Sequence, residues 1–187
     1  MEATIESTIG KGMEGLDKAI DHLKTELMKI RAGKASPSMI QGISVDYYGN
    51  ATPLNQVANV STPDSRTLAI QPWEKGMLGA IEQAIFGANI GLTPMNDGEY
   101  VRITIPPLTE DRRKELVKQC KVLSEESKIG LRNERHKMID FIKKEVKDGY
   151  PEDAGKKKES DVEQMIKDYT KKVEDLLAAK EKEIMTV

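Results

Sequence analysis

The basic side chains between Leu108 and Lys147 are the residues whose types and spacing could do chemistry. On a helix with about 100° per residue, seven cationic or imidazole side chains fall on one side: Lys114, Lys118, Lys121, Lys128, Arg132, Arg135 and His136. Arg132 and Arg135 lie about one turn apart, so their planar guanidinium groups can each bind a phosphate through two hydrogen bonds. The spacing predicts a surface that binds a polyanion, and a stiff array of charge suits the backbone of A-form RNA.

A basic stripe also has a simpler explanation, which is a solvated face that keeps a long helix in solution. Three features favour binding. The stripe carries a single acid on its seam, Glu125, its two arginines point the same way, and it belongs to the most rigid predicted element. From Arg112 to Lys147 there are 12 Lys or Arg against 6 Asp or Glu, a local net charge of +6, although the whole chain has a net charge of −2. A nearly neutral chain can therefore still present a basic face.

Sequence patterns for catalysis and metal binding are missing. The chain has two distant histidines, His22 and His136, and one cysteine, Cys120, whereas a zinc site needs three or four close ligands. It has no GxxxxGK[ST] phosphate loop and no GxGxxG dinucleotide fingerprint, and no serine stands beside a base in a nucleophile motif. We expect a binding protein rather than an enzyme, with no catalytic residue, no metal and no cofactor.

The composition points to helices in water. Charged residues make up 32% of the chain and aromatic residues 4%, which is typical of long solvated helices rather than of a compact enzyme core. No apolar run is long enough to cross a bilayer, and the first residues lack the hydrophobic centre of a signal peptide. We expect a soluble cytoplasmic protein that makes no contact with a membrane.

Three helical segments should position the basic stripe. The long one begins after the N-cap candidate Thr109 and meets no proline before Pro151. A first helix, up to Ile30, repeats apolar residues at intervals of four and three from Leu16 onward, as in a coiled-coil seam. A third segment near the C-terminus has a similar stripe. The long helix has an apolar stripe of its own, which includes Leu116, Leu131 and Met138. We predict that the three apolar stripes pack against one another in an elongated bundle.

Two local signals bear on the ends of these helices. Gly10, Gly12 and Gly15 weaken the early turns of the first helix, so its start should fray. The sequence SDVE, Ser160–Glu163, has the form of a capping box. It predicts that the last helix begins there, after a turn over residues 148–158.

The middle of the chain changes to short runs rich in β-branched residues. The predicted strands are Ile43–Gly49, Val57–Ser61, Thr67–Gln71 and Tyr100–Ile105, with a helix between Trp73 and Asn89 and a loop over residues 93–98. This predicts an α+β fold. Residues 31–105 would form a small β/α/β domain inserted into a three-helix bundle made of residues 1–30 and 106–187.

The two connections between these domains are short, at residues 31–36 and 105–108. Two short connections can act as a hinge, because few backbone dihedral angles must change to swing one domain against the other. The predicted hinge residues are Ala32, Gly33, Ser36, Pro106 and Pro107.

Several motifs together resemble one known family. They are RAGKASP (31–37), VDYYG (45–49), TPLNQVANV (52–60), PDSRTL (63–68), TPMNDG (93–98), RITIPPLTEDRRKEL (102–116) and RNERHKM (132–138). In this order they resemble the bacterial ribosome recycling factor family from end to end. The resemblance implies an L-shaped molecule of the size and outline of a transfer RNA. It also implies a factor that binds between the ribosomal subunits after termination and splits them with elongation factor G and GTP.

The resemblance also implies which residues bind. In this family, the arginines of an RNxR motif, here Arg132 and Arg135, hold the bundle on large-subunit ribosomal RNA. We expect Lys121 and Lys128 to add less specific attraction. The family usually has arginine at the positions of Lys34 and His136; the lysine keeps the charge without the planar fork, and the histidine is mostly neutral at pH 7.

Arg31, near the hinge end, is a further candidate for the RNA contact. A cation matched to the dipole at the end of the first helix explains this residue equally well. We expect a monomer whose partners are the ribosome and elongation factor G. The alternative is a coiled-coil adaptor or chaperone that holds protein clients on exposed apolar stripes. Affinity for RNA should fall steeply with salt, whereas affinity for such clients should not.

Overall fold

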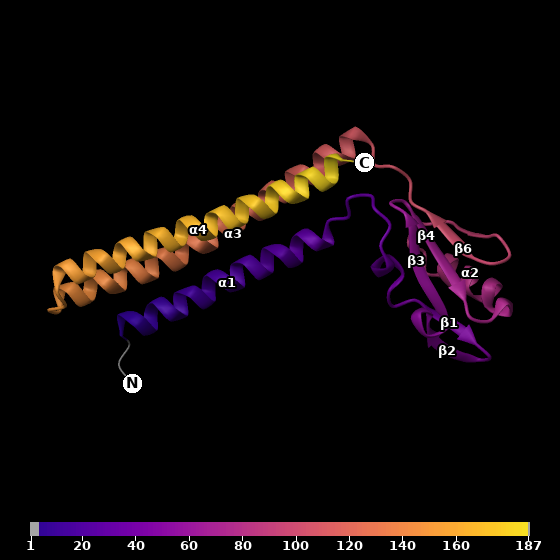
Figure 1. Cartoon of the computed structure of the whole chain (residues 1–187), viewed down its shortest axis with the longest axis horizontal. Helices are drawn as coiled ribbons and strands as arrows, with labels where there is room; N and C mark the ends of the chain where they lie inside the picture. Colours follow the sequence, from indigo (N-terminus) through magenta and orange to yellow (C-terminus); the bar gives the residue numbers. More distant parts are fainter. Residues whose placement is uncertain (1–3, 187) are drawn as a thin grey trace. The chain divides into compact units, whose positions relative to one another are not determined.

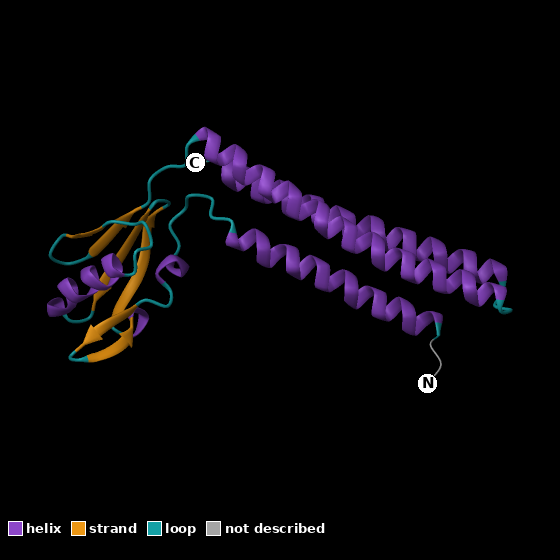
Figure 2. Cartoon of the chain, turned by 180° about the vertical axis from the view of Figure 1, so that it is seen from behind, coloured by secondary structure: helices purple, strands orange, loops and turns teal. Residues whose placement is uncertain are grey.

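The structure is a computed structural model that describes residues 4–186. The chain forms two compact units: one is Ala32–Leu108, and the other combines the chain up to Arg31 with the chain from Thr109 onward (Figure 1). Figure 2 shows that the second of these units is helical and that the strands belong to the first. The predicted α+β fold, a long helical part with a small β-sheet domain, is confirmed.

The helical unit consists of α1 (Ile5–Lys29), α3 (Glu110–Lys147) and α4 (Glu152–Met185). With 38 residues, α3 is about 57 Å long. Both α4 and α1 pack along it (Figures 1 and 2). The seams face inward as predicted, and the side chains with 2% exposure or less include Leu16, Leu23, Leu131, Met138, Ile142, Val162, Val173 and Ile184.

The first helix begins at Ile5, directly after its N-cap Thr4, and fraying of its early turns stays a prediction. Thr4 and Ser7 form a capping box that satisfies backbone donors at the start of α1. Gly12 is buried because α1 approaches α3 closely there: a Cβ at this position would lie 2.3 Å from Sδ of Met138. The glycine that weakens the isolated helix therefore permits its contact with α3.

The last helix begins at Glu152, not at Ser160, so the predicted start was wrong. Ser160 lies inside α4, and the turn from α3 spans only residues 148–151. Two features of the sequence favour the earlier start of α4. Glu152 and Asp153 stand in the first turn, where acids suit the helix dipole, and Gly155 lets α4 approach Val146 of α3, which a Cβ would meet at 2.4 Å.

The second unit has a two-stranded hairpin, a four-stranded antiparallel sheet with strand order β3-β4-β6-β5, and one helix. Its elements are β1 (Ser44–Tyr47), β2 (Asn50–Pro53), β3 (Ala58–Asp64), β4 (Thr67–Pro72), α2 (Leu78–Gly87), β5 (Pro94–Asn96) and β6 (Val101–Thr104). The prediction missed β2, and it treated β5 as a loop. Proline at one end of each strand and the short length of both strands conceal them.

The core of this unit lies between the sheets and α2. β4 is one of the two inner strands, and its Ile70 lies opposite Val60 of β3 and Val101 of β6. From α2, Ile81 and Ile85 pack with the sheet residues in one buried cluster. Because α2 shows one apolar face and β4 is buried along most of its length, the unit has a hydrophobic core of its own.

Candidate nucleic-acid interface

Three of the predicted binding residues face α4. Lys121, Lys128 and Arg135 are spaced by seven residues on α3, so they lie on one side of it. Each contacts an acid of α4. Lys121 Nζ lies 4.0 Å from Glu181 Oε1, Lys128 Nζ lies 3.6 Å from Glu174 Oε1, and Arg135 contacts Glu163.

The Arg135 pair has the strongest geometry of the three. Nε, at 2.9 Å, and Nη2 of Arg135 both donate to Oε1 of Glu163. The hydrogen bond from Arg135 lowers the pKa of the Glu163 carboxyl, and the same bond raises the pKa of the Arg135 guanidinium. The two side chains are 33% and 42% exposed. Such partly exposed pairs stabilise a protein by about 0.2–1 kcal/mol.

The sequence predicts that the two arginines point the same way, but in the structure Arg135 has a carboxylate partner on α4, so this prediction is wrong for Arg135. Arg132 is exposed, and within residues 4–186 its side chain has no hydrogen bond or ion pair. Three residues along a helix turn a side chain by about 300°, so the two groups diverge by about 60°. That angle is enough for one to meet α4 while the other faces solvent. Whether either residue contacts RNA stays a prediction.

The exposed face around Arg132 is partly apolar, which the sequence analysis missed. Val122 and Ile129 of α3 are 57% and 50% exposed. With Arg132 and His136 they follow helical spacing and share one side of α3. The signal was present as two β-branched residues seven positions apart, outside the buried stripe. This face could combine a guanidinium contact to phosphate with apolar contact to sugar or base surfaces.

The remaining predicted cations are exposed. His136 lies on the same face as Arg132, and Arg31 follows the C-cap of α1 at Ile30. Neither side chain has a hydrogen bond or an ion pair to any other described residue. Lys34 belongs to the other unit and is also exposed.

Two backbone hydrogen bonds hold the predicted hinge segments to the sheet unit. Ala35 N donates to Ser65 O, and Ile105 N donates to Arg66 O, both at 2.8 Å. Both links are thus attached to the turn between β3 and β4. Ala32, Gly33, Pro106 and Pro107 lie beyond these attachments, whereas Ser36 caps a short 3-10 helix, Pro37–Ile40. Gly33 has a φ of +75°, a left-handed conformation that favours glycine.

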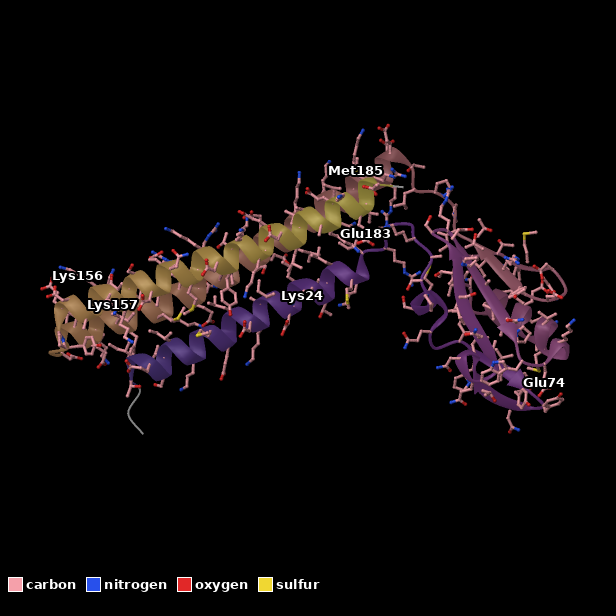
Figure 3. All side chains as sticks on the ribbon, in the orientation of Figure 1. Lys24, Glu74, Lys156, Lys157, Glu183 and Met185 are labelled. Carbon is pink, nitrogen blue, oxygen red and sulfur yellow. The ribbon has the colours of Figure 1, made fainter. Side chains whose placement is uncertain are left out.

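Over residues 4–186, no group of three or more His, Cys, Asp or Glu side chains could hold a metal ion. Among the described helices, none is long and apolar enough to cross a membrane. Figure 3 draws the described side chains of α3 and of the helices beside it.

Comparisons with known proteins give one consistent family. A family model described as ribosome recycling factor matches residues 23–185. The chain is 49% identical over 184 residues to a ribosome-recycling factor of Porphyromonas gingivalis, covering 98% of this chain and 99% of that protein. It is 53% identical over 174 residues to the ribosome-recycling factor of Flavobacterium johnsoniae, covering 93% of each.

Two solved structures are similar in fold and sequence. A solution structure of a ribosome recycling factor aligns with a TM-score of 0.72 and 33% identity, covering 100% of both chains. A second match has a TM-score of 0.61 and 36% identity, and covers 98% of this chain and 100% of the other. It comes from models of the T. thermophilus ribosome recycling factor and the E. coli elongation factor G bound to the E. coli post-termination complex.

Proposed function

The chain belongs to the ribosome recycling factor family, and on that premise we propose that it binds the post-termination ribosome. There, with elongation factor G and GTP, it promotes dissociation into subunits. It acts in the cytoplasm as a monomeric translation factor without catalytic residues, metal or cofactor. The observation that carries the binding step is the exposed Arg132 guanidinium, without a protein partner among residues 4–186, on the 38-residue helix α3.

The RNA contact has a graded set of residues. Arg132 is the primary anchor on large-subunit ribosomal RNA, because its guanidinium can take phosphate without giving up a protein contact. Arg135 joins by exchanging its Glu163 partner for phosphate. Lys121 and Lys128 are paired with α4, so they contribute mainly longer-range attraction. His136 and Arg31 lie exposed and add weaker contacts.

The hinge is the second part of the proposal. The bundle of residues 1–30 and 106–187 and the inserted domain of residues 31–105 move as two bodies about the two links. Attachment of both links to the turn between β3 and β4 supports this, because it leaves Ala32–Lys34 and Pro106–Leu108 as the segments that can rotate. Gly33 has the widest backbone freedom among them, while Ser36, Pro106 and Pro107 limit where bending occurs.

An adaptor that holds protein clients is supported less well. That function needs exposed apolar seams, but the seams of α1, α3 and α4 are buried against one another. Val122 and Ile129 are the exposed apolar pair on α3 that such an adaptor would use. The same pair fits the RNA-binding face equally well, so it does not favour the adaptor.

Ribosome binding measured against salt concentration tests the proposal. Affinity should fall steeply as salt rises, through release of counterions from RNA. Arg132→Ala should weaken binding by about 1–3 kcal/mol, which is roughly 5- to 150-fold, and should reduce the salt slope by about one. Arg112→Ala is the matched control, since it removes an exposed arginine from the start of the same helix, away from Arg132. Unchanged binding by the Arg132 variant, with its thermal stability intact, would refute the anchor.

A further inference from the structure

The unit of strands carries an aromatic cluster around one carboxylate that the proposed function does not use. Tyr47 ends β1 and Tyr48 begins the turn to β2. Their hydroxyl groups donate to different oxygens of Glu74, each at 2.8 Å, although the tyrosines lie 27 and 26 residues from Glu74 in sequence. The two rings meet edge to face with centroids 4.8 Å apart. Figure 3 labels Glu74 near the hairpin end of the unit.

A hollow of about 210 Å³ opens beside this carboxylate. Its walls include the Tyr47 ring, Val57, Trp73 and Met77. Trp73, the residue before Glu74, is 70% exposed, and Tyr48 is 75% exposed. Neither aromatic side chain is therefore needed to fill the core. Large aromatic side chains left in solvent around a pocket are typical of a contact surface.

The Glu74 carboxylate has no ion-pair partner among the described residues. Hydrogen bonds from Tyr47 and then Tyr48 lower the pKa of this carboxyl, so it is ionised at neutral pH. A carboxylate has about four lone-pair positions, and the two tyrosines occupy two of them. The others can accept from a ligand.

The turn at Tyr48 adds a second indication. Tyr48 has a φ of +49°, and Gly49, the next residue, has a φ of +87°. A left-handed conformation is unfavourable for a bulky residue, and glycine or asparagine adopts it more easily in a two-residue hairpin turn. Tyrosine at this position gains its bond to Glu74, which fixes the carboxylate beside the hollow.

We propose that this hollow is a docking site for an arginine side chain on an exposed segment of a protein partner. The guanidinium would donate to Glu74 and lie against the faces of Tyr47 and Trp73, which attract cations through the ring quadrupole. A planar guanidinium fits between aromatic walls better than a compact, strongly hydrated ammonium group does. RNA is a poorer occupant, because Glu74 repels phosphate. An RNA base stacked on the aromatic rings is the alternative that the experiment must distinguish from arginine.

The single tryptophan of the chain makes this testable without a ribosome. The full chain is titrated with the peptide acetyl-Gly-Arg-Gly-amide while Trp73 fluorescence is recorded. The matched peptide replaces arginine by citrulline, which has a similar shape and no charge. The arginine peptide should give a saturable change, and its affinity should exceed that of the citrulline peptide by about tenfold or more. Equal responses to the two peptides would overturn the proposal, as would tighter binding of an oligouridylate.

A pair of variants identifies the carboxylate. Glu74→Gln should lower the affinity for the arginine peptide by about tenfold. Glu99→Gln removes an exposed carboxylate elsewhere in the same unit and should leave the titration unchanged. Full binding by the Glu74 variant would exclude this site. Should that variant fail to fold, the comparison of the two peptides on the unaltered chain still decides the question. The result does not depend on the RNA contact of α3.

Discussion

The Arg135–Glu163 pair yields the most specific prediction, because the carboxylate competes with phosphate for the same guanidinium. Glu163→Gln removes the charge while keeping the size of the side chain. Arg135 must give up Glu163 before it can bind a phosphate, so removing this competitor should strengthen ribosome binding. The gain is bounded by the strength of the pair, which is about 0.2–1 kcal/mol for partly exposed groups. The expected increase in affinity is therefore about 1.4- to 5-fold.

The assay measures ribosome binding at low and high salt for four proteins: the unaltered chain, Glu163→Gln, Arg135→Ala and the double variant. The gain should appear in Glu163→Gln and be absent from the double variant, since it acts through Arg135. Asp175→Asn is the matched control, because it removes an exposed acid of α4 that has no described ion pair. The free energy of unfolding of Glu163→Gln should fall by no more than about 1 kcal/mol.

Two results would contradict this reasoning. If Glu163→Gln bound ribosomes more weakly, the carboxylate would be orienting Arg135 towards RNA rather than competing for it. If the Asp175 control gained as much affinity as Glu163→Gln, the effect would come from net charge alone. Either result would remove Glu163 as a competitor while leaving the role of Arg132 open to its own test.

Three further predictions concern packing, the hinge and pH. In a denaturant titration, Gly12→Ala should lower the free energy of unfolding by about 1–3 kcal/mol, because its Cβ would meet buried Met138. Gly10→Ala is the control: a Cβ there has nothing within 4 Å, so this change should raise the free energy of unfolding by about 0.5–1 kcal/mol. Gly33→Ala should lower the free energy of unfolding by about 1–2 kcal/mol, because alanine is unfavourable at a φ of +75°. The same variant should slow subunit splitting without weakening ribosome binding in the absence of elongation factor G. Burial, followed by a hydrogen bond to Asp17, raises the pKa of Tyr169 from 10.0 to about 12, so its contribution to stability is complete below pH 10 and is lost as the pH rises towards 12. Tyr169→Phe should lack this decline in unfolding titrations; an identical decline in both proteins would contradict the assignment.

Local pattern was sufficient for the helical seams and for most strands. Intervals of three and four residues identified the buried faces of α1 and α3, including Leu16 and Leu131, because a side chain's angle around a helix follows from its position in sequence. β-branched runs located β4 and β6 in the same way. The short strands β2 and β5 and the start of α4 were missed, since pairing partners and packing, rather than local preference, determine them.

The sequence by itself determined that Arg132 and Arg135 share one broad side of a long helix, and it identified the family through its motifs. Only the tertiary structure decided that Arg135 meets Glu163 while Arg132 faces solvent. It also brought Tyr47 and Tyr48 to Glu74 across more than 25 residues. The physical reason is that periodicity specifies an angle about one helix axis, whereas the short turn and close packing between α3 and α4 decide which part of that angle is covered.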